Sequence, residues 1–403
     1  MPYLCRGVHM NDLAKAPCIK YARLRHVIRS LFFFQIRLSA AILVAALAMT
    51  VSCQKEKPVI KIGFAGGLTG RYSDLGTAGR NGVILAVEEI NKAGGINGRP
   101  LELLIKDDRQ DPARALEVDS ELIKEGVAAI IGHMTSAMST AVMPLINEKK
   151  TLLLSPTTST GELTGKDDWF MRVVGTSIET PRRLADYAFG RAGTDRIAVI
   201  YDLENRAYCE SYAEAFNSRF KELGGLLSSV VTYSKGDDAS FEMLAMRLVS
   251  SGCSGVLVIA SAIDAAMICQ QIRKIEKSLP FFSSGWAMTD EFIQNGGRAV
   301  EGVVIAEFFI TGSESEEYVA FKESFKNRFG AEPSFPAGYG YEAAMVLFSA
   351  LSREPDPLKL KQTIVAIKRF KGLQGDFEID SFGDAVRKLS VTKVSDGQFR
   401  TLE

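Results

Sequence analysis

Thr135 and Ser136 are the first residues whose type and position suit the binding of a small polar molecule. They follow an apolar run at 127–131, which is typical of a buried strand. A helical pattern begins just beyond them near Met138, so Ser136 can cap that helix while neighbouring N–H groups attract an anion. Because open α/β sheets bind ligands outside the carboxyl ends of their strands, we predict ligand contact here, with a helix cap as an alternative or additional role.

A second hydroxyl-rich segment repeats this arrangement. Thr157 and Ser159 lie within Ser-Pro-Thr-Thr-Ser, directly after the strand pattern at 151–154. A solvated turn would also explain three hydroxyl residues after a proline. The position at the end of a strand favours a ligand site.

Groups for catalysis are scarce. His133 is the only histidine after residue 52, and neither a Ser-His-Asp set nor a Cys/His cluster with metal-ligand spacing can be built around it. Asp107 and Asp108 are adjacent at a strand end and should point to opposite sides, so a solvated edge or a loop anchor explains them. The glycines do not match G-x-G-x-x-G, which argues against a dinucleotide enzyme. We expect no enzyme activity, no metal and no cofactor.

Residues 61–108 contain a complete strand–helix–strand unit that would position such a site. Gly66, Gly67 and Gly70 lie where the first strand ends, so the loop can bring backbone N–H groups close to a ligand. Apolar residues three and four apart predict the helix: Val83, Ala86, Val87 and Ile90.

The same alternation continues along most of the chain. The patterns predict strands at Val59–Ala65, Leu101–Asp107, Val127–Ile131, Thr151–Leu154, Arg196–Tyr201, Leu227–Tyr233, Gly255–Ala260, Phe281–Ser283 and Val303–Phe308. They predict helices at Arg114–Glu125, Met138–Glu148, Thr180–Arg191, Cys209–Leu223, Phe241–Ser251, Asp264–Lys277, Glu316–Arg328, Tyr339–Ser352 and Leu358–Lys368. Continuous apolar strands bracketed by helices indicate α/β architecture, with parallel sheets covered on both faces.

Length and charge limit the organisation and the partners. A chain of 403 residues favours two domains. The formal net charge is +0, but residues 1–52 carry seven basic residues and one acidic residue, so the remainder is acidic. A mildly acidic body argues against a nucleic-acid partner.

The first 52 residues have the pattern of a signal peptide. A basic region reaches Arg37, an apolar run follows, and Ser52 precedes Cys53. The run is shorter than the roughly 20 residues that span a bilayer. It resembles a bacterial lipoprotein signal, which implies lipidation of Cys53 and a tether at 53–57, although Thr50 departs from the pattern. Plain secretion, an uncleaved anchor or a start within an N-terminal extension are the alternatives.

Ordered blocks after residue 58 resemble the periplasmic solute-binding proteins of branched-chain amino acid ABC transporters. The blocks are GFAGGLTG, AVEEINKAGGINGRPLEL, KDDRQDPARA, AAIIGHMTSAMS and LLLSPTTST, followed by FGAEPSFPAGYGYEAA and LQGDFEID. The resemblance implies the type I periplasmic binding fold, two Rossmann-like doubly wound lobes joined by a hinge of three crossings. Lobe one would comprise 58–175 plus 307–372, and lobe two 176–306 plus 373–403. In the family a late strand such as Phe377–Ile379 returns to lobe two.

The resemblance also assigns roles in the cleft between the lobes. The residue aligned with Ser136 binds the α-carboxylate, and residues aligned with Thr157 and Ser159 hold the carboxylate and the amino group. Tyr208 aligns with a tyrosine that closes over the ligand.

Other positions depart from the family pattern. The acid that pairs with a ligand ammonium should lie near Gly285–Trp286, where there is none, so Asp290 or Asp264 could replace it or the ligand could lack an ammonium. Trp286 could stack on a flat or apolar ligand, or simply pack. One expected tyrosine falls on Leu75, with Tyr72 nearby, and a second aromatic falls on Ser261 or Ala262.

A disulfide that the family often has is also not expected. It joins the segments aligned with 107–112 and 134–136, and neither segment contains cysteine. We predict that Cys253 and Cys269 are small buried apolar residues.

The sequence therefore predicts an extracytoplasmic lipoprotein, in the periplasm or cell envelope, that passes a small ligand to a membrane permease. A branched-chain amino acid, an amide, a short-chain carboxylate or an aromatic acid would fit. A ligand sensor of the same fold that acts on a regulator is the alternative.

Overall fold

The computed structural model describes residues 29, 31–32, 34–37, 58–234, 236, 239–310 and 312–402. Residues 1–57 and 58–403 are separate units. In the first unit the described residues are helical, and the predicted signal peptide, Cys53 and the tether otherwise lie outside the described residues. No helix in the described part of the chain is both long and apolar enough to cross a membrane.

The first sheet of the second unit has five strands in the order β2-β1-β3-β4-β5. The strands are β1 (Ile60–Gly66), β2 (Leu101–Asp107), β3 (Ile130–Ile131), β4 (Leu153–Ser155) and β5 (Phe170–Arg172). All neighbouring strands are parallel, so their carboxyl ends meet at one edge. The order reverses at β1, between β2 and β3, which is the switch point where ligands bind in open α/β sheets.

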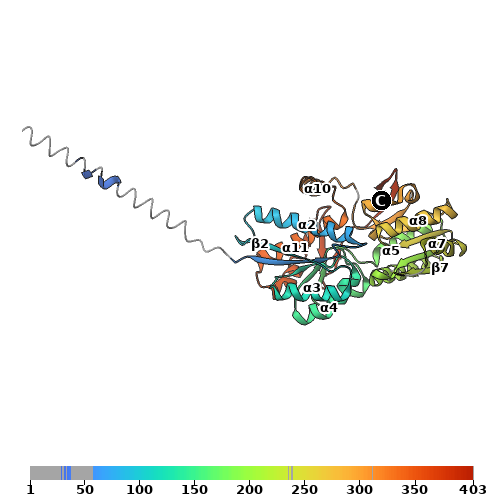
Figure 1. The fold of residues 1–403 in the computed structure, drawn as a ribbon, viewed down its shortest axis with the longest axis horizontal. Helices are drawn as coiled ribbons and strands as arrows, with labels where there is room; N and C mark the ends of the chain where they lie inside the picture. Colours follow the sequence, from blue (N-terminus) through green and yellow to red (C-terminus); the bar gives the residue numbers. More distant parts are fainter. Residues whose placement is uncertain are drawn as a thin grey trace, which may run out of the picture. The chain divides into compact units, whose positions relative to one another are not determined.

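Helices cover both faces of this sheet (Figure 1). One face is covered by α2 (Ser73–Lys92) and α11 (Phe335–Arg353), which pack against each other, and the other by α3 (Pro112–Lys124) and α4 (Ser136–Lys149). The apolar residues of α3 and α4 form their own buried cluster with the sheet. Helix α10 (Glu316–Phe329) contacts α2, and α12 (Leu360–Ile367) contacts α11.

The second sheet has seven strands in the order β15-β14-β10-β9-β8-β6-β7. Its parallel part consists of β6 (Arg196–Asp202), β7 (Leu226–Tyr233), β8 (Gly255–Ile259), β9 (Phe281–Ser283) and β10 (Val304–Glu307). The antiparallel strands β14 (Ser390–Ser395) and β15 (Gln398–Thr401) extend it beyond β10. Helix α5 (Glu179–Gly190) precedes β6, and the helices between the parallel strands are α6 (Arg206–Glu222), α7 (Phe241–Ser250), α8 (Ala262–Ile275) and α9 (Asp290–Gly296).

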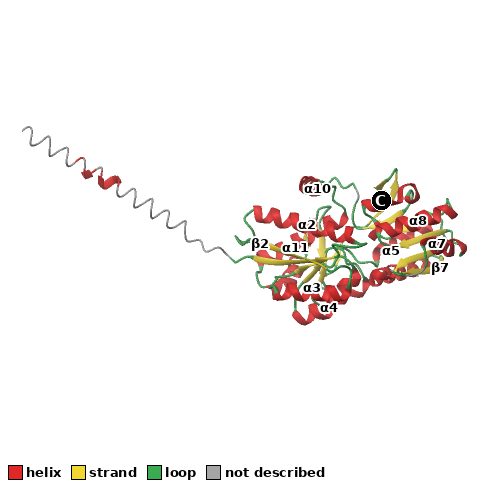
Figure 2. Ribbon diagram, viewed as in Figure 1, coloured by secondary structure: helices red, strands yellow, loops and turns green. Residues whose placement is uncertain are grey.

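The chain passes between the two sheets three times. It leaves the first sheet after β5, returns after β10 to form the helices that pack on α2, and enters the second sheet again at β14. Figure 2 shows strands enclosed by helices in both halves. The predicted α/β fold of two doubly wound halves with three connections is therefore confirmed.

The late strand is where the expectation fails. Phe377–Ile379 does form a strand, β12, but it pairs with β11 (Arg369–Phe370) and β13 (Ala385–Val386) in a separate three-stranded sheet. The strand that joins the seven-stranded sheet is β14, whose apolar residues Val391 and Val394 are fully buried.

Candidate ligand-binding cleft

A cavity lies where the carboxyl ends of strands from both sheets meet, and its empty space, including the part open to solvent, is about 500 Å³. Six of the seven ligand-binding residues that the sequence predicts line it: Thr135, Ser136, Thr157, Ser159, Tyr208 and Trp286. The first four belong to the half with the first sheet, and the last two belong to the other half. The structure thus brings together residues that are up to 151 positions apart, from Thr135 to Trp286.

The wall on the side of the first sheet is built from hydroxyl groups. Thr135 donates a hydrogen bond to Gln110 Oε1 at 2.8 Å, and Thr157 donates one to the carbonyl of Met134 at 2.6 Å. Ser136 Oγ accepts from the N–H of Thr160 at 3.3 Å, so its own proton stays available to a ligand oxygen.

Ser136 does not cap helix α4. The N-cap is Thr135, whose side chain makes no capping hydrogen bond, and Ser136 is the first helical residue. The N–H of Ala137 donates to Asn205 Oδ1 at 3.1 Å, and Asn205 itself lines the cavity. The start of α4 therefore faces the cavity, and Asn205 of the other half lies beside it. Because Ser136 is not the helix cap, that alternative to a ligand role is removed.

Two aromatic side chains of the other half, Tyr208 and Trp286, also line the cavity. Trp286 packs with its ring centroid 5.5 Å from Tyr72 and, edge to face, 6.1 Å from Tyr208. Each of the three rings is at most 8% exposed. Burial raises the pKa of the Tyr208 hydroxyl well above its ordinary value, so this tyrosine is neutral and can donate.

Glu307 is the acidic residue that lines the cavity, and sequence reasoning missed it. It is the last residue of β10 and 9% exposed, and its Oε1 accepts from the N–H of Phe308 at 2.7 Å. Burial raises the pKa of its carboxyl group to about 7, against the opposing effects of that hydrogen bond and of the Arg387 charge. A single acid inside the apolar run Val-Val-Ile-Ala-Glu-Phe-Phe was the pattern that could have revealed it, because unpaired acids are rarely buried.

The two acids proposed as replacements lie elsewhere. Asp290 is exposed at the start of α9 and does not line the cavity. Asp264 is fully buried, but it forms an ion pair with Arg71 and accepts from the hydroxyl of Tyr233 at 2.9 Å. Neither carboxylate is placed to meet a molecule in this cavity.

Contacts from the first loop cross between the halves beside the cavity. The Tyr72 hydroxyl donates to Asp202 Oδ2 at the end of β6 over 2.6 Å, and Arg71 pairs with Asp264 on α8. Leu75 lines the cavity at the position where the family pattern has tyrosine. Ser261, where a second aromatic was expected, is the N-cap of α8 and accepts from the N–H of Asp264 at 3.4 Å.

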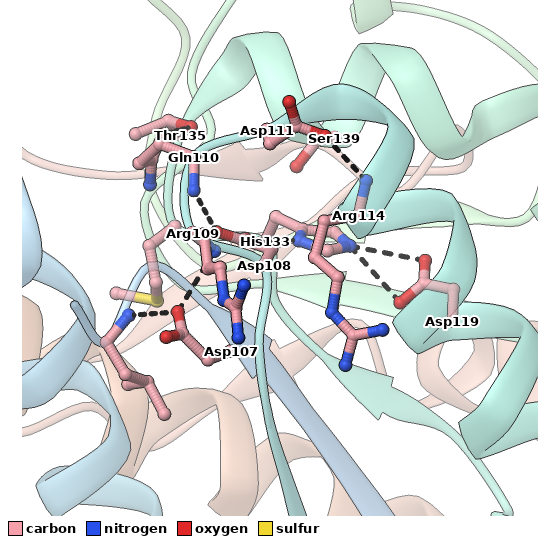
Figure 3. Close-up of polar contacts among 12 residues, drawn as sticks. Asp107, Asp108, Arg109, Gln110, Asp111, Arg114, Asp119, His133, Thr135 and Ser139 are labelled. Carbon is pink, nitrogen blue, oxygen red and sulfur yellow. Dashed lines mark hydrogen bonds and ion pairs between the residues drawn. The ribbon is translucent and has the colours of Figure 1, made fainter. Parts of the chain in front are cut away.

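A buried histidine fixes the loop that carries Thr135 and Ser136 (Figure 3). His133 Nδ1 lies 2.7 Å from Asp108 Oδ2, and its Nε2 lies 3.2 Å from both oxygens of Asp119. Burial alone would lower the pKa of His133, but the charge of Asp119 and the hydrogen bonds to both acids raise it to about 10. The imidazolium thus lies between two fully buried acids and supplies a positive charge to both.

Asp107, next to Asp108, anchors a different loop. Its carboxylate accepts from the N–H of Leu68 at 2.8 Å and from the Thr69 hydroxyl at 2.6 Å. The two neighbouring aspartates therefore hold the glycine-rich loop and the loop of His133 respectively, which agrees with the prediction of loop anchors.

The cysteines follow the prediction in part. Cys269 is buried and free, whereas Cys253 is only half-buried and also free. Within the part of the chain that the structure describes, no group of three or more His, Cys, Asp or Glu residues is arranged to hold a metal ion.

Comparison with known proteins gives the family. A model of the periplasmic binding protein family matches residues 59–398. A leucine-, isoleucine-, valine-, threonine- and alanine-binding protein from Pseudomonas aeruginosa is 25% identical, over 86% of this chain and 93% of that protein. The solved structure of a leucine binding protein from Thermotoga maritima is 27% identical, covers 85% of this chain and 98% of that chain, and superposes with a TM-score of 0.79.

The fold is shared more widely than this. A solute binding protein of an ABC transporter from R. palustris, solved with benzoate, matches with a TM-score of 0.77 at 20% identity, over 85% of this chain and 95% of that chain. This likeness concerns the fold alone.

The site and the fold define a type I periplasmic binding protein. This chain belongs to that family, in the branched-chain amino acid group. Membership supports a ligand-binding role and a periplasmic or other extracytoplasmic location.

Proposed function

We propose that this protein is the substrate-binding component of an ABC importer, which captures a branched-chain amino acid or a related small carboxylate or amide. The observation that carries the proposal is the cavity at the carboxyl ends of strands from both sheets. Hydroxyl groups and the start of α4 offer donors on one side, and Glu307 with aromatic rings lies on the other. The names of the P. aeruginosa and T. maritima relatives support an amino acid.

The protein would act by binding and closure, without covalent chemistry. The half built on the first sheet would move as lobe one, and the half built on the second sheet, which includes Glu307 at the end of β10, would move as lobe two. A ligand that touches both lobes stabilises the closed form, because it has more contacts there than in an open form. The membrane permease would recognise the closed form.

A screen of ligands tests the proposal directly. The purified protein is heated with leucine, isoleucine, valine, their deaminated acids, their amides and benzoate, and calorimetry measures the affinity of each compound that raises the melting temperature. A true ligand at about 100 times its dissociation constant adds about 2.7 kcal/mol of stability. If none of the compounds binds, this assignment is wrong.

We also propose that a lipid on Cys53 tethers the protein to the membrane, since the residues before it have the pattern of a lipoprotein signal. Cys53→Ser should then move the protein from the membrane fraction to the soluble fraction of the producing cells. Labelling with a radioactive fatty acid should mark the wild type and not the variant. Equal fractionation and no label in either would point to plain secretion or an uncleaved anchor.

A further inference from the structure

The carboxyl group of Glu307 lies where the chain itself makes room for it. Strands β9 and β10 are parallel, with Val304 opposite Phe282 and Ile305 opposite Ser283. The same register, continued by two residues, places Glu307 opposite Gly285. A Cβ atom built on Gly285 would come within 1.6 Å of Glu307 Oε2, so a larger residue at 285 would displace the carboxyl group. The absence of a side chain at Gly285 therefore leaves the space that the Glu307 carboxyl group occupies.

The charge of this carboxyl group is not balanced by the protein. Among the described residues, no lysine or arginine forms an ion pair with Glu307. The charge of Arg387 acts on it, but the Arg387 guanidinium pairs with Glu342 and donates to the carbonyl of Val173. A buried carboxylate without a cation is unfavourable. A cationic group from a ligand would supply the missing charge.

An unpaired hydroxyl group accompanies the acid. Tyr339 lines the same cavity, is 2% exposed, and its hydroxyl makes no hydrogen bond with the described residues. The charge of Glu307 raises the pKa of Tyr339 in addition to the effect of burial, which shows that the two groups are close. Buried polar groups are usually hydrogen-bonded, so the Tyr339 hydroxyl also calls for a polar partner.

The remaining lining separates a polar end from an apolar part. Ser136, Thr157 and Ser159 provide hydroxyl groups from the half with the first sheet, whereas the acid comes from β10 of the second sheet. Apolar residues complete the walls: Leu75, Met134, Val174, Phe308 and Phe335. A molecule with an anionic group, a cationic group and an apolar side chain matches all three regions.

We propose that Glu307, supplied by β10 and accommodated by Gly285, is the residue that selects an α-amino group, so that the ligand is a small apolar α-amino acid. The family pattern has its acid near Gly285–Trp286, and in this chain Glu307 of the neighbouring strand β10 takes that role. This inference rests on the proposed binding function and narrows its ligand class. Deaminated, amide and aromatic compounds should bind weakly.

The test compares pairs of ligands on two proteins. Calorimetry measures the affinity of each amino acid that binds and of the same compound without its amino group, for the wild type and for Glu307→Gln, which keeps the shape and removes the charge. We expect the wild type to prefer the amino acid by about 10- to 100-fold. Glu307→Gln should lose most of this preference by weakening the amino acid alone.

Three outcomes would overturn the inference while leaving the binding function intact. The wild type could bind deaminated or aromatic acids as well as amino acids, which needs no variant and stands even if Glu307→Gln fails to fold. Glu307→Gln could keep the full preference. Asp290→Asn could abolish the preference, which would assign recognition of the amino group to Asp290 at the start of α9. Absence of any binding would instead refute the proposed function.

Discussion

Ser136 keeps its hydroxyl proton for a ligand, because its oxygen accepts a hydrogen bond from the N–H of Thr160. Ser136→Ala should weaken ligand binding by about 1–3 kcal/mol, since a ligand carboxylate would lose one hydrogen bond. Calorimetry with the best ligand of the screen measures the change. Ser120→Ala is the matched control, because the Ser120 hydroxyl donates to the carbonyl of Leu116 on exposed helix α3. Equal affinities for both variants would limit Ser136 to its bond with Thr160.

Glu307 should couple binding to proton release. Burial raises the pKa of its carboxyl group to about 7 in the empty cleft, and a ligand cation would lower this pKa because it favours the charged form. Near pH 7 the protein therefore loses part of a proton when it binds an amino acid, and below that pH the affinity falls. Calorimetry in buffers of different ionisation enthalpy measures the released fraction.

Several groups face Glu307 and enter this prediction. Tyr208 and Tyr212 of α6 and Tyr339 of α11 have pKa values raised well above the ordinary range, so they stay neutral throughout. The charge of Arg387 also acts on Glu307. Glu307→Gln should abolish the release. A release of equal size in the variant would assign the proton to another group.

At this scale the sequence was most informative where a residue acts next to its own strand end. Thr135, Ser136, Thr157 and Ser159 were predicted from their places just beyond the ends of apolar runs, and all four line the cavity. Glu307 was missed because its role depends on a strand partner 22 positions away, Gly285, and strand register cannot be read from composition.

Among the elements, the loop between β3 and α4 depends on the buried His133 network. The pKa of His133 is about 10 in the folded protein, whereas an unfolded chain has about 6.5. Because the folded-state pKa is the higher one, this network stabilises the fold fully below about pH 6.5 and loses that contribution as the pH rises through about 10. The melting temperature should fall across this interval.

Asp119→Asn tests the origin of that fall. The variant removes the largest favourable charge acting on His133, so the folded-state pKa of the imidazole should be lower. The decline in stability should still begin near pH 6.5, but it should end at a lower pH and be smaller than in the wild type. We also expect a loss of about 1–3 kcal/mol at pH 6.5, from the weakened hydrogen bonds. Differential scanning calorimetry from pH 6 to 10 measures both effects. Superimposable curves for the variant and the wild type would contradict this role of the network.

The elements themselves were predictable where the pattern was long. The limits of β2 and β9 agree with the prediction, and the helices differ by a few residues at their ends. The three-residue strand β5 and the seven-residue helix α9 were missed, because neither repeats its period often enough to be recognised. The hairpin of β14 and β15 was missed because both strands alternate polar and apolar residues weakly.

For the whole molecule, the contacts that cross between the two halves should control ligand release. Tyr72 donates to Asp202 across this boundary at 2.6 Å. Tyr72→Phe removes the bond and should destabilise the closed form, so the ligand should dissociate about tenfold faster. Stopped-flow fluorescence of Trp286, which packs against Tyr72, measures the rate.

Tyr341→Phe provides the comparison for that experiment. The Tyr341 hydroxyl donates to Glu89 at 2.7 Å, but both residues lie on helices that cover the first sheet. Its loss should leave the dissociation rate unchanged even if stability falls. A similar acceleration in both variants would mean that the effect of Tyr72 is general loosening of the fold.

The two sheets followed from the alternation of strands and helices, but their three connections came from the family resemblance and not from the residues. Nothing local in the sequence distinguishes the chain after β10, which returns to the first half, from a chain that continues in the second. Packing of α11 against α2 decides this, through pairs of buried residues more than 240 positions apart.

The position of Glu307 has a consequence for evolution of this protein. Glu307 is the last residue of β10, after which the chain returns to the first half. Its carboxyl group accepts a hydrogen bond from the N–H of Phe308, the first residue of that connection. If the protein binds and closes as proposed, a substitution here that changes the ligand would therefore also change a segment that connects the two halves. In relatives that bind a different ligand through a substitution at position 307, we expect compensating changes at Phe308 and Gly285. The three positions should therefore vary together.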